Sequence, residues 1–495
     1  MKKLVGCDKL LESSEKHDII KESLIKIVGE QWYSDFPEEL LIYSYDMTEN
    51  DPSLPEFVVM PRTSEEIQKI LKFANETKTP VVPFISGNNV GGLTIPLKGG
   101  IVVDLKRMDS ILHFNEDDMY VIIEPGVTFG HLHAFLEKTN YRYCYPFAPP
   151  FTSVIANALL DGLNNLSLRH GSMNEWINGI EAILPNGDLV KIGTCCAWGD
   201  NYDLWWSRNP MPDLLGLFTS WQGMTGIVTK MAVQVWPRRP IRDSRIVLSF
   251  NVEETYKFVK TLTHLEILND ILFMSIETVK MIAGVPYGKA KYLEGEPRWV
   301  CLLDFSANTK LEYEAKLDMI NTAFKKLKEV DPKANMTNLD VMEKFYGKKV
   351  GDIKNLPVTI GPMLEYGGLT WMGTYMTTKT EAVVNGIKTA FDLIDKYRFE
   401  KCLYSRSMKG HHYFAFRFLL RFSKLQEGET ERMQKLQEEL FNSLFELGAF
   451  PYKTPARFAK QILKRADPNW VNLLKTIKST IDPNGIMNPG RWGLE

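Results

Sequence analysis

A short β-α-β unit that runs into a glycine-rich loop is the feature that most constrains this fold. Residues 56–61 (EFVVMP) and 79–85 (TPVVPFI) predict two strands, and residues 63–78 predict the helix between them. Thr63 can cap that helix and Glu66 can complete a capping box. The apolar residues of the helix share one face, which is typical of a helix that packs on a sheet: Ile67, Ile70, Leu71 and Ala74.

The loop that follows, residues 86–92 (SGNNVGG), is a candidate anion site. Its three glycines let an anion approach closely, and its backbone N–H groups can donate to a phosphate. The loop matches neither the GxGxxG pattern of a dinucleotide fold nor a P-loop. A plain turn is the alternative interpretation, because glycine-rich turns are common.

The rest of the chain predicts an α+β protein with more than one domain. Strands dominate residues 50–237, where Asn186-Gly187 between apolar runs indicates a hairpin turn. Longer amphipathic helices alternate with strands over 238–455, and a helix and a Pro/Gly-rich tail close the chain. With 495 residues, the chain exceeds one ordinary core.

Composition limits the class of protein. The sequence is 44% hydrophobic and 24% charged with a net charge of -2, which is typical of a soluble protein and gives no support for nucleic-acid binding. The N-terminus lacks the apolar core of a signal peptide, and no apolar run is long enough to span a bilayer, so a cytoplasmic protein is expected. Six cysteines without a CxxC pair predict reduced thiols and no metal site.

Six segments together carry a family resemblance. In order they read VVPFISGNNVGG (81–92), GGIVVDLKRM (99–108), YVIIEPGVTFGHLHAFLE (120–137), GIEAILPNGDLVKIG (179–193), GMTGIVTKMAVQVWP (223–237) and DPNGIMNPGRWG (482–493). The series resembles the vanillyl-alcohol oxidase and 4-cresol dehydrogenase family of FAD-dependent oxidoreductases. The resemblance covers about residues 45–495, nearly the whole chain.

This resemblance implies a two-domain fold that binds FAD. An FAD-binding domain with an N-terminal helical segment takes residues 1–237, and an α/β cap with an antiparallel sheet takes 238–455. Residues 456–495 return to the FAD domain. The resemblance places the FAD pyrophosphate on the 86–92 loop and implies this full set of cofactor contacts: Ser86, Gly87, Asn88, Asn89, Val90, Gly91, Gly92, Pro125, Thr152, Ser153, Ala156, Gly171, Ser172, Ile227, Val228 and Arg491.

The resemblance also implies a substrate site in the cap, and the sequence departs from the family pattern at Lys453 and in three further places. Tyr452 and Lys453 match a Tyr-Arg pair that binds a phenolate in phenol-oxidising members, and lysine replaces the arginine fork with a point charge. A loop tyrosine of those members falls at Gly92 or Leu93, and an aspartate near the reacting carbon falls at Ser172. The flavin-tethering position matches Gly368, so we expect FAD to be bound non-covalently. We therefore expect a substrate other than a simple 4-alkylphenol.

The pair His411-His412 opens the segment GHHYFAFRF, which predicts a strand. Alternation on a strand places His412 with Phe414, Phe416 and Phe418 on one face, and His411 with Tyr413, Ala415 and Arg417 on the other. The two rings then diverge, and no further ligand has suitable spacing for a metal.

A structural role, one histidine buried and one exposed, is the alternative to a role at the flavin. The resemblance implies that one of the two sits at the pyrimidine edge of FAD and stabilises the reduced flavin, with Lys453 in the same role. Arg406 and Arg417 could neutralise an acid, although solvated charges are the expected interpretation.

Three hypotheses for function follow. The first is an FAD-dependent oxidase or dehydrogenase that oxidises an aromatic or apolar alcohol, or an activated C–H carbon, by hydride transfer to flavin N5. The second is an FAD-linked 2-hydroxyacid dehydrogenase subunit, although the GDGNxH-like metal string of that branch is absent from the sequence. The third is a non-catalytic flavoprotein subunit. Electrons would pass to oxygen or to a redox partner protein, and we expect a homo-oligomer or a subunit of a redox complex.

Overall fold

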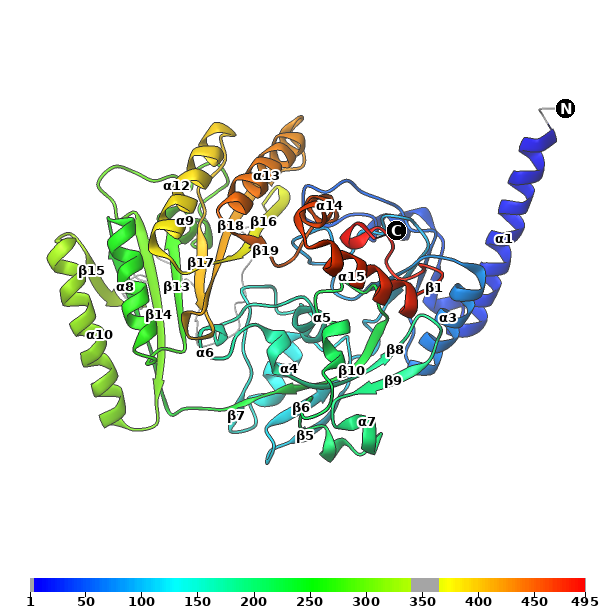
Figure 1. Cartoon of the computed structure of the whole chain (residues 1–495), viewed down its shortest axis with the longest axis horizontal. Coiled ribbons are helices and arrows are strands. Elements are labelled where there is room, and N and C mark those ends of the chain that lie inside the picture. The colour runs from blue at the N-terminus through cyan, green and yellow to red at the C-terminus, as the bar shows by residue number, and fades with distance from the viewer. Residues whose placement is uncertain (1–3, 340–364, 495) are drawn as a thin grey trace.

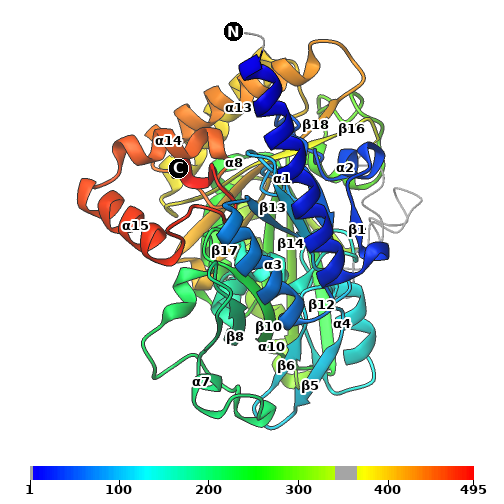
Figure 2. The same ribbon diagram turned by 90° about the vertical axis from the view of Figure 1, so that its right-hand side faces the viewer.

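A computed structural model describes residues 4–339 and 365–494, and it divides into two parts (Figure 1). We call the part expected to bind FAD, residues 4–237 with 456–494, the FAD-side half, and the part from β12 to β19 the cap. The first sheet has the order β1-β2-β4-β3, in which β2, β4 and β3 are parallel and β1 is antiparallel. Its elements are α1 (Leu4–Val28), β1 (Tyr33–Ser34), α2 (Pro37–Ile42), β2 (Phe57–Val59), α3 (Ser64–Thr77), β3 (Val81–Phe84) and β4 (Ile101–Asp104). The predicted β-α-β unit is β2-α3-β3, and Figure 2 shows α1 beside α3.

The Thr63 cap forms as the sequence predicts, whereas the second bond of the predicted capping box goes to Arg62, one residue before the cap, and not to Thr63. The Thr63 hydroxyl accepts from the Glu66 N–H, and the Glu66 carboxylate accepts from the backbone N–H of Arg62. The apolar stripe of α3 is fully buried, which fixes the helix on the sheet and so fixes where β3 delivers the chain into the 86–92 loop.

A second, antiparallel sheet has the order β5-β6-β10-β8-β9. The β8-β9 hairpin turns at Asn186-Gly187, where Gly187 has φ +84°, as predicted. The elements are β5 (Ile111–Asn115), β6 (Tyr120–Ile123), α4 (Phe129–Leu136), α5 (Val154–Leu159), α6 (Ser167–His170), β8 (Ile177–Ile183), β9 (Leu189–Ile192), α7 (Cys195–Trp198) and β10 (Ile227–Gln234), with a small pair of β7 (Tyr141–Arg142) and β11 (Trp236–Pro237).

The cap is one antiparallel sheet of eight strands, in the order β15-β12-β14-β13-β17-β18-β16-β19. Helices cover one face, and Phe414, Phe416 and Phe418 are buried beneath them. The elements are β12 (Ile241–Ser249), α8 (Val252–His264), β13 (Asp270–Ser275), α9 (Ile276–Ile282), β14 (Trp299–Ala307), α10 (Lys310–Val330), β15 (Asn335–Asn338), β16 (Gly367–Met376), α12 (Thr380–Lys396), β17 (Tyr404–Met408), β18 (Tyr413–Ser423), α13 (Glu429–Glu446) and β19 (Phe450–Pro451).

The C-terminal segment joins the FAD-side half through α14 (Ala456–Arg465) and α15 (Pro468–Ile481). The Val81 N–H donates to the Ile486 carbonyl at 2.7 Å, and the Asn488 N–H donates to the Val81 carbonyl at 2.8 Å. The tail thus extends the first sheet beside β3. The predicted two-domain α+β fold is confirmed, while the three domain boundaries stay a prediction.

In the part of the chain that the structure describes, no helix is long and apolar enough to cross a bilayer. The same residues contain no cluster of His, Cys, Asp and Glu side chains that could hold a metal ion.

Candidate functional site

The glycine-rich loop is held in place by the turn at residues 149–153. The Ser86 hydroxyl accepts from the Ser153 N–H at 2.8 Å, and the Asn88 amide donates to the Thr152 hydroxyl at 2.5 Å. Within the loop, the Asn89 side-chain oxygen accepts from the Gly91 N–H at 2.7 Å. These bonds make a preformed loop rather than a plain turn between strands.

A cavity of about 1030 Å³ lies beside this loop. We call it the larger cavity, to distinguish it from the neighbouring cavity described below. It spans the carboxyl end of β3, the N-terminal part of α5 and the start of β10. Nine of the predicted cofactor residues line it: Ser86, Gly87, Asn88, Asn89, Thr152, Ser153, Ala156, Ile227 and Val228. Its other lining residues include Thr94, Asn157, Gln222, Gly223, Thr225, Lys453 and Asn488.

The polar groups of this cavity fit FAD. Among the described residues, the backbone N–H groups of Gly87, Asn88 and Asn89 have no protein acceptor, so the loop can donate them to a phosphate. The Gln222 side-chain oxygen is buried in the cavity wall without a hydrogen-bond donor in the described chain. A bound group that donates there would remove the cost of that orphaned acceptor.

Seven predicted contacts lie elsewhere. Val90 and Gly91 line smaller cavities next to this one. A Cβ on Gly92 would stand 2.6 Å from the Asn50 amide, and a Cβ on Gly171 would collide with the Glu175 carboxylate. The remaining three are off the cavity surface: Pro125 and Arg491 bond the lining residues Ser153 and Asn488, and Ser172 donates to Asn174 away from the cavity.

Arg491 holds the far end of the loop region. It is 1% exposed, and its Nη2 donates to the Ile95 carbonyl at 2.5 Å while its Nε donates to Asn488 at 3.4 Å. Burial lowers the pKa of Arg491 to about 10, which leaves it charged at neutral pH. Its place indicates a structural link between the tail and the loop.

A second cavity, of about 660 Å³, adjoins the first between the FAD-side half and the cap; we call it the substrate cavity. Asn88, Thr152, Asn157 and Lys453 line both cavities. The walls of the substrate cavity are mainly apolar or aromatic. They comprise Met47, Val90, Pro146, Phe147, Ala148, Pro149, Leu163, Leu369 and Trp371, together with Arg417 and Tyr452.

The polar groups of the substrate cavity are mostly donors. Arg417, on β18, is 2% exposed, and its Nε donates to the Tyr404 carbonyl at 3.1 Å. Its Nη2 has no hydrogen-bond partner among the described residues, and neither has the Trp371 indole N–H. None of the described residues that line the cavity is an aspartate or a glutamate.

The expectation that Arg417 is a solvated charge is wrong. Arg417 is buried because the FAD-side half covers the face of the sheet that carries it. Arg406 is likewise buried, at 3% exposed, beside Asp270.

Lys453 stands at the boundary of the two cavities. Its Nζ lies 3.4 Å from the Asn157 side-chain oxygen, and it has no ion-pair partner within the described chain. Burial lowers the pKa of Lys453 to about 8, and this is opposed by the negative charge of Asp161. A cation so poorly compensated favours an anion in either cavity.

Tyr452 stacks on Tyr375 with ring centroids 4.9 Å apart. It lies over Gly373, where a Cβ would stand only 2.5 Å from the Tyr452 ring, so glycine is required for this close approach. Burial raises the pKa of the Tyr452 hydroxyl, and Arg417 opposes the rise. Tyr452 is therefore a neutral hydroxyl that can donate to an anion.

The structure does not bring the two histidines to either cavity. Strand β18 begins at Tyr413, and His411 ends a 3₁₀ turn (Lys409–His411) with φ 74°, so strand alternation does not govern the pair. His411 is 4% exposed, and its Nδ1 shares a hydrogen bond of 2.8 Å with the Ser407 hydroxyl. Its ring packs near Tyr256, whereas His412 is exposed.

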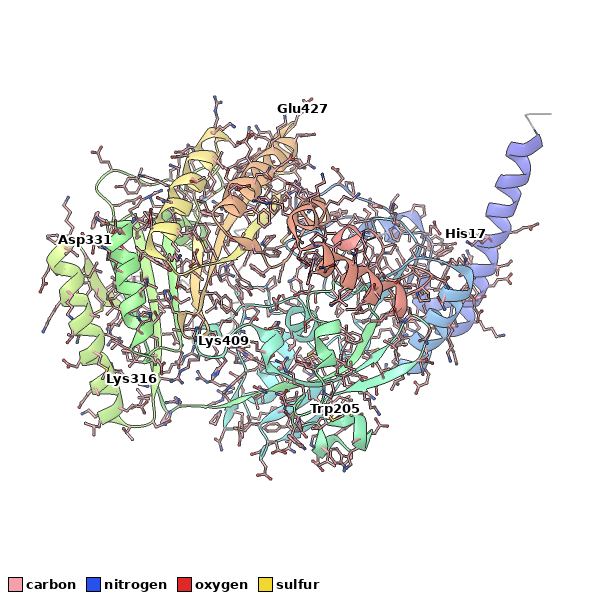
Figure 3. All side chains as sticks on the ribbon, viewed as in Figure 1. His17, Trp205, Lys316, Asp331, Lys409 and Glu427 are labelled. Carbon is pink, nitrogen blue, oxygen red and sulfur yellow. The ribbon has the colours of Figure 1, made fainter. Side chains whose placement is uncertain are left out.

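This turn instead meets the FAD-side half, where Lys409 pairs with Glu175; Figure 3 labels Lys409 at the end of the cap sheet. Burial and the neighbouring His264 and Lys260 lower the pKa of His411 to about 4. A neutral ring away from the cavities gives no support for the flavin role, and we assign it a structural one.

Gly368, which matches the flavin-tethering position of the family, lies on β16 opposite Phe422 and lines neither cavity. No histidine, tyrosine or cysteine is among the described residues that line the larger cavity.

Sequence reasoning did not select Trp371 and Asn157 as members of the site, and it weighed Arg417 as a partner for an acid but favoured a solvated charge. Alternation along β18 placed Arg417 opposite the phenylalanine core, and this signal could have selected it once the other face was assigned to the domain interface. Asn157 follows directly in the segment that supplies Thr152 and Ser153, but nothing in its spacing distinguishes it.

Comparisons with known proteins agree with this geometry. Residues 55–193 match the model of an FAD binding domain, and residues 247–492 match that of the C-terminal domain of FAD linked oxidases. The chain is 25% identical to the glycolate oxidase subunit GlcD of Bacillus subtilis over 95% of this chain and 96% of that protein. It is 24% identical to the 4-cresol dehydrogenase [hydroxylating] flavoprotein subunit of Pseudomonas putida over 92% of each.

The solved structure of p-cresol methylhydroxylase with substrate bound superposes with a TM-score of 0.85 over 97% of both chains, at 18% identity, which shows the shared fold. With both domain models matched in the expected order and a cavity that fits the cofactor, the chain belongs to the FAD-linked oxidoreductases, shares the fold of p-cresol methylhydroxylase and is an FAD-dependent enzyme.

Proposed function

We propose that this enzyme oxidises the alcohol carbon of a hydroxy acid that has an apolar or aromatic body. One observation carries the proposal: Arg417 is buried with an unpaired Nη2 in a cavity that also holds Lys453 and, among its described lining residues, no carboxylate. Two uncompensated cations favour an anionic substrate, and Arg417 suits a carboxylate because its planar fork matches that group.

In the proposed complex, the loop N–H groups of Gly87, Asn88 and Asn89 hold the FAD phosphates. When bound, FAD accepts the hydride that the substrate gives up. Arg417 and the Trp371 N–H bind and orient the carboxylate, while the Tyr452 hydroxyl donates a further hydrogen bond. The apolar walls exclude water, which strengthens these charged contacts.

Lys453 lies at the boundary of the two cavities, where its positive charge stabilises negative charge on the cofactor and on the substrate. Its ammonium faces the larger cavity as well as the substrate cavity, so its charge acts on the cofactor and on the bound acid. Positive charge held at that point favours reduction of the cofactor.

A 4-substituted phenol bound as its phenolate is the second candidate. Tyr452 next to Arg417, with aromatic walls formed by Phe147 and Trp371, supports it. The relative named 4-cresol dehydrogenase agrees with this candidate, and the relative named glycolate oxidase subunit agrees with the first.

We also propose that FAD is bound non-covalently, since the larger cavity offers no nucleophilic ring or thiol among its described residues. Acid precipitation of purified enzyme is expected to release the yellow colour. Colour that stays in the precipitate would contradict this.

Anaerobic reduction of the holoenzyme tests the substrate class. The probes are an aryl 2-hydroxy acid, the benzyl alcohol that lacks its carboxylate, and a 4-alkylphenol. Bleaching of the flavin by the hydroxy acid alone supports the first candidate, and bleaching by the phenol alone supports the second. Bleaching by benzyl alcohol as fast as by the acid would overturn both. Admitting oxygen, or an artificial electron acceptor, to the reduced enzyme then separates an oxidase from a dehydrogenase.

A further inference from the structure

A third cavity lies on the same face of the cap sheet as Arg417. Its empty volume is about 470 Å³, and its polar wall is formed by Arg242 on β12, Asp304 on β14, Asp270 on β13 and Arg406 on β17. Pro146 and Phe147 line both this cavity and the substrate cavity, so the two are neighbours on either side of one turn of the chain.

The charges of the third cavity are balanced, unlike those of the substrate cavity. Arg242 binds Asp304 through two parallel hydrogen bonds, Nε to Oδ1 at 3.0 Å and Nη2 to Oδ2 at 3.1 Å. Arg406 pairs with Asp270 at 3.4 Å. Two cations face two anions, so the cavity does not select a charged ligand group.

Two buried atoms in this wall nevertheless lack partners. Asp270 is 4% exposed and Arg406 is 3% exposed. Asp270 Oδ1 and Arg406 Nε have no hydrogen-bond partner among the described residues. An orphaned acceptor beside an orphaned donor is costly when buried, and one neutral group with both functions would satisfy the pair.

Phe147 stands between the two cavities. Its ring stacks on Tyr404, with centroids 4.9 Å apart, and Tyr404 lines the third cavity. Phe147 is half-buried and lies in a segment without helix or strand between β7 and α5. A side-chain rotation of Phe147 is thus the smallest change that would join the two spaces.

We propose that the third cavity is a second binding subsite that receives the far end of the substrate, and that this end is a neutral group which both donates and accepts hydrogen bonds, such as a carboxamide or a hydroxyl. The inference rests on the proposed function, because the acid end of the same molecule is held at Arg417 and Lys453. The substrate class becomes an elongated acid with a carboxamide or hydroxyl terminus, which reaches past Phe147.

Binding to the oxidised holoenzyme tests this without turnover. The probes are straight-chain monocarboxylates with a methyl end and monoamides of dicarboxylic acids of matched length, over a series of lengths. Perturbation of the flavin absorbance gives Kd. At the length that reaches the subsite, the monoamide is expected to bind about tenfold more tightly than its methyl-ended partner, the scale of one to two hydrogen bonds.

Variants locate the effect. Leu302→Phe fills the third cavity and is expected to abolish the preference for the amide, as is Asp270→Leu, which removes the orphaned acceptor. Leu248→Phe and Asp243→Asn, on β12 at positions that do not line the third cavity or the substrate cavity, are the matched controls and should keep it. Thermal unfolding and FAD content show whether each variant is folded.

The outcomes separate the two proposals. An equal Kd for the monoamide and the methyl-ended acid at every length would overturn the subsite, because the carboxamide would then gain no hydrogen bond in the third cavity. Loss of the preference in the control variants would overturn it as well. Failure of every carboxylate to bind would instead contradict the proposed function.

Discussion

At the scale of single residues, Lys453 gives the clearest pH dependence. Its pKa of about 8 lies below the ordinary value of 10.5 because its ammonium is buried, so the side chain is charged below pH 8 and loses its proton above it. Anion binding favours the charged form and is lost as the pH rises. We expect KM for an acid substrate to rise about tenfold at alkaline pH, from near pH 8 upward.

The control is Lys453→Met, which should show a high KM that no longer depends on pH in this range. Lys460→Met, on the surface of α14, should keep the wild-type profile. If KM of Lys453→Met still rose at alkaline pH as it does in the wild type, the role given to this lysine would be contradicted.

The same scale shows where prediction from the sequence succeeds and where it fails. Alternation correctly separates Arg417 from the buried Phe414, Phe416 and Phe418, because residues 413–423 form a regular strand. It fails for the two histidines because Gly410, with φ +64°, turns the chain before the strand begins. It also fails to show that Arg417 is buried, because alternation does not tell which partner covers a face.

At the scale of elements, Tyr452, which follows β19, is held in place by close packing of its ring on Gly373 of β16. Because a Cβ at Gly373 would stand 2.5 Å from the Tyr452 ring, Gly373→Ala should push the ring into the substrate cavity. We expect stability to fall by about 1–3 kcal/mol and kcat/KM to fall about tenfold or more. Thermal unfolding and steady-state kinetics measure the two effects.

Gly216→Ala serves as the control, since nothing lies within 4 Å of a Cβ built there. If Gly373→Ala kept wild-type kcat/KM, the placement of Tyr452 against the substrate would be wrong.

Elements are also what the sequence predicts best in this protein. The β2-α3-β3 unit, its Thr63 cap and the β8-β9 hairpin follow from local patterns, because each is fixed by residues within one short segment. The nine cofactor residues in the larger cavity came from the family resemblance, since their segments meet only in the folded chain.

At the scale of the whole molecule, the site exists only where the two halves meet. Lys453 and Asn88 line the same two cavities although 365 residues of sequence separate them, as their numbers show. No period or spacing predicts such a junction. The orphaned groups of Arg417, Trp371 and Gln222 become visible as a site only once the domains are in place.

The tail is a second whole-molecule link. Arg491 ties residues 488–491 to Ile95 beyond the glycine-rich loop, so Arg491→Met should loosen the loop and lower stability by about 2 kcal/mol. FAD should also dissociate more readily on gel filtration. Arg465→Met, at an exposed pair with Glu446, should leave both unchanged. Tight FAD retention in Arg491→Met would show that the tail does not support the loop.

The central claim is that a buried arginine selects an acid substrate. The direct measurement is the anaerobic rate of flavin reduction against the concentration of an aryl 2-hydroxy acid, in wild-type enzyme and in Arg417→Gln. The claim predicts that the concentration for half-maximal rate rises about tenfold to hundredfold in Arg417→Gln, the scale of one charged hydrogen-bonded contact, while Arg245→Gln on the far strand β12 behaves as wild type. Equal concentrations for half-maximal rate in wild type and Arg417→Gln would contradict it.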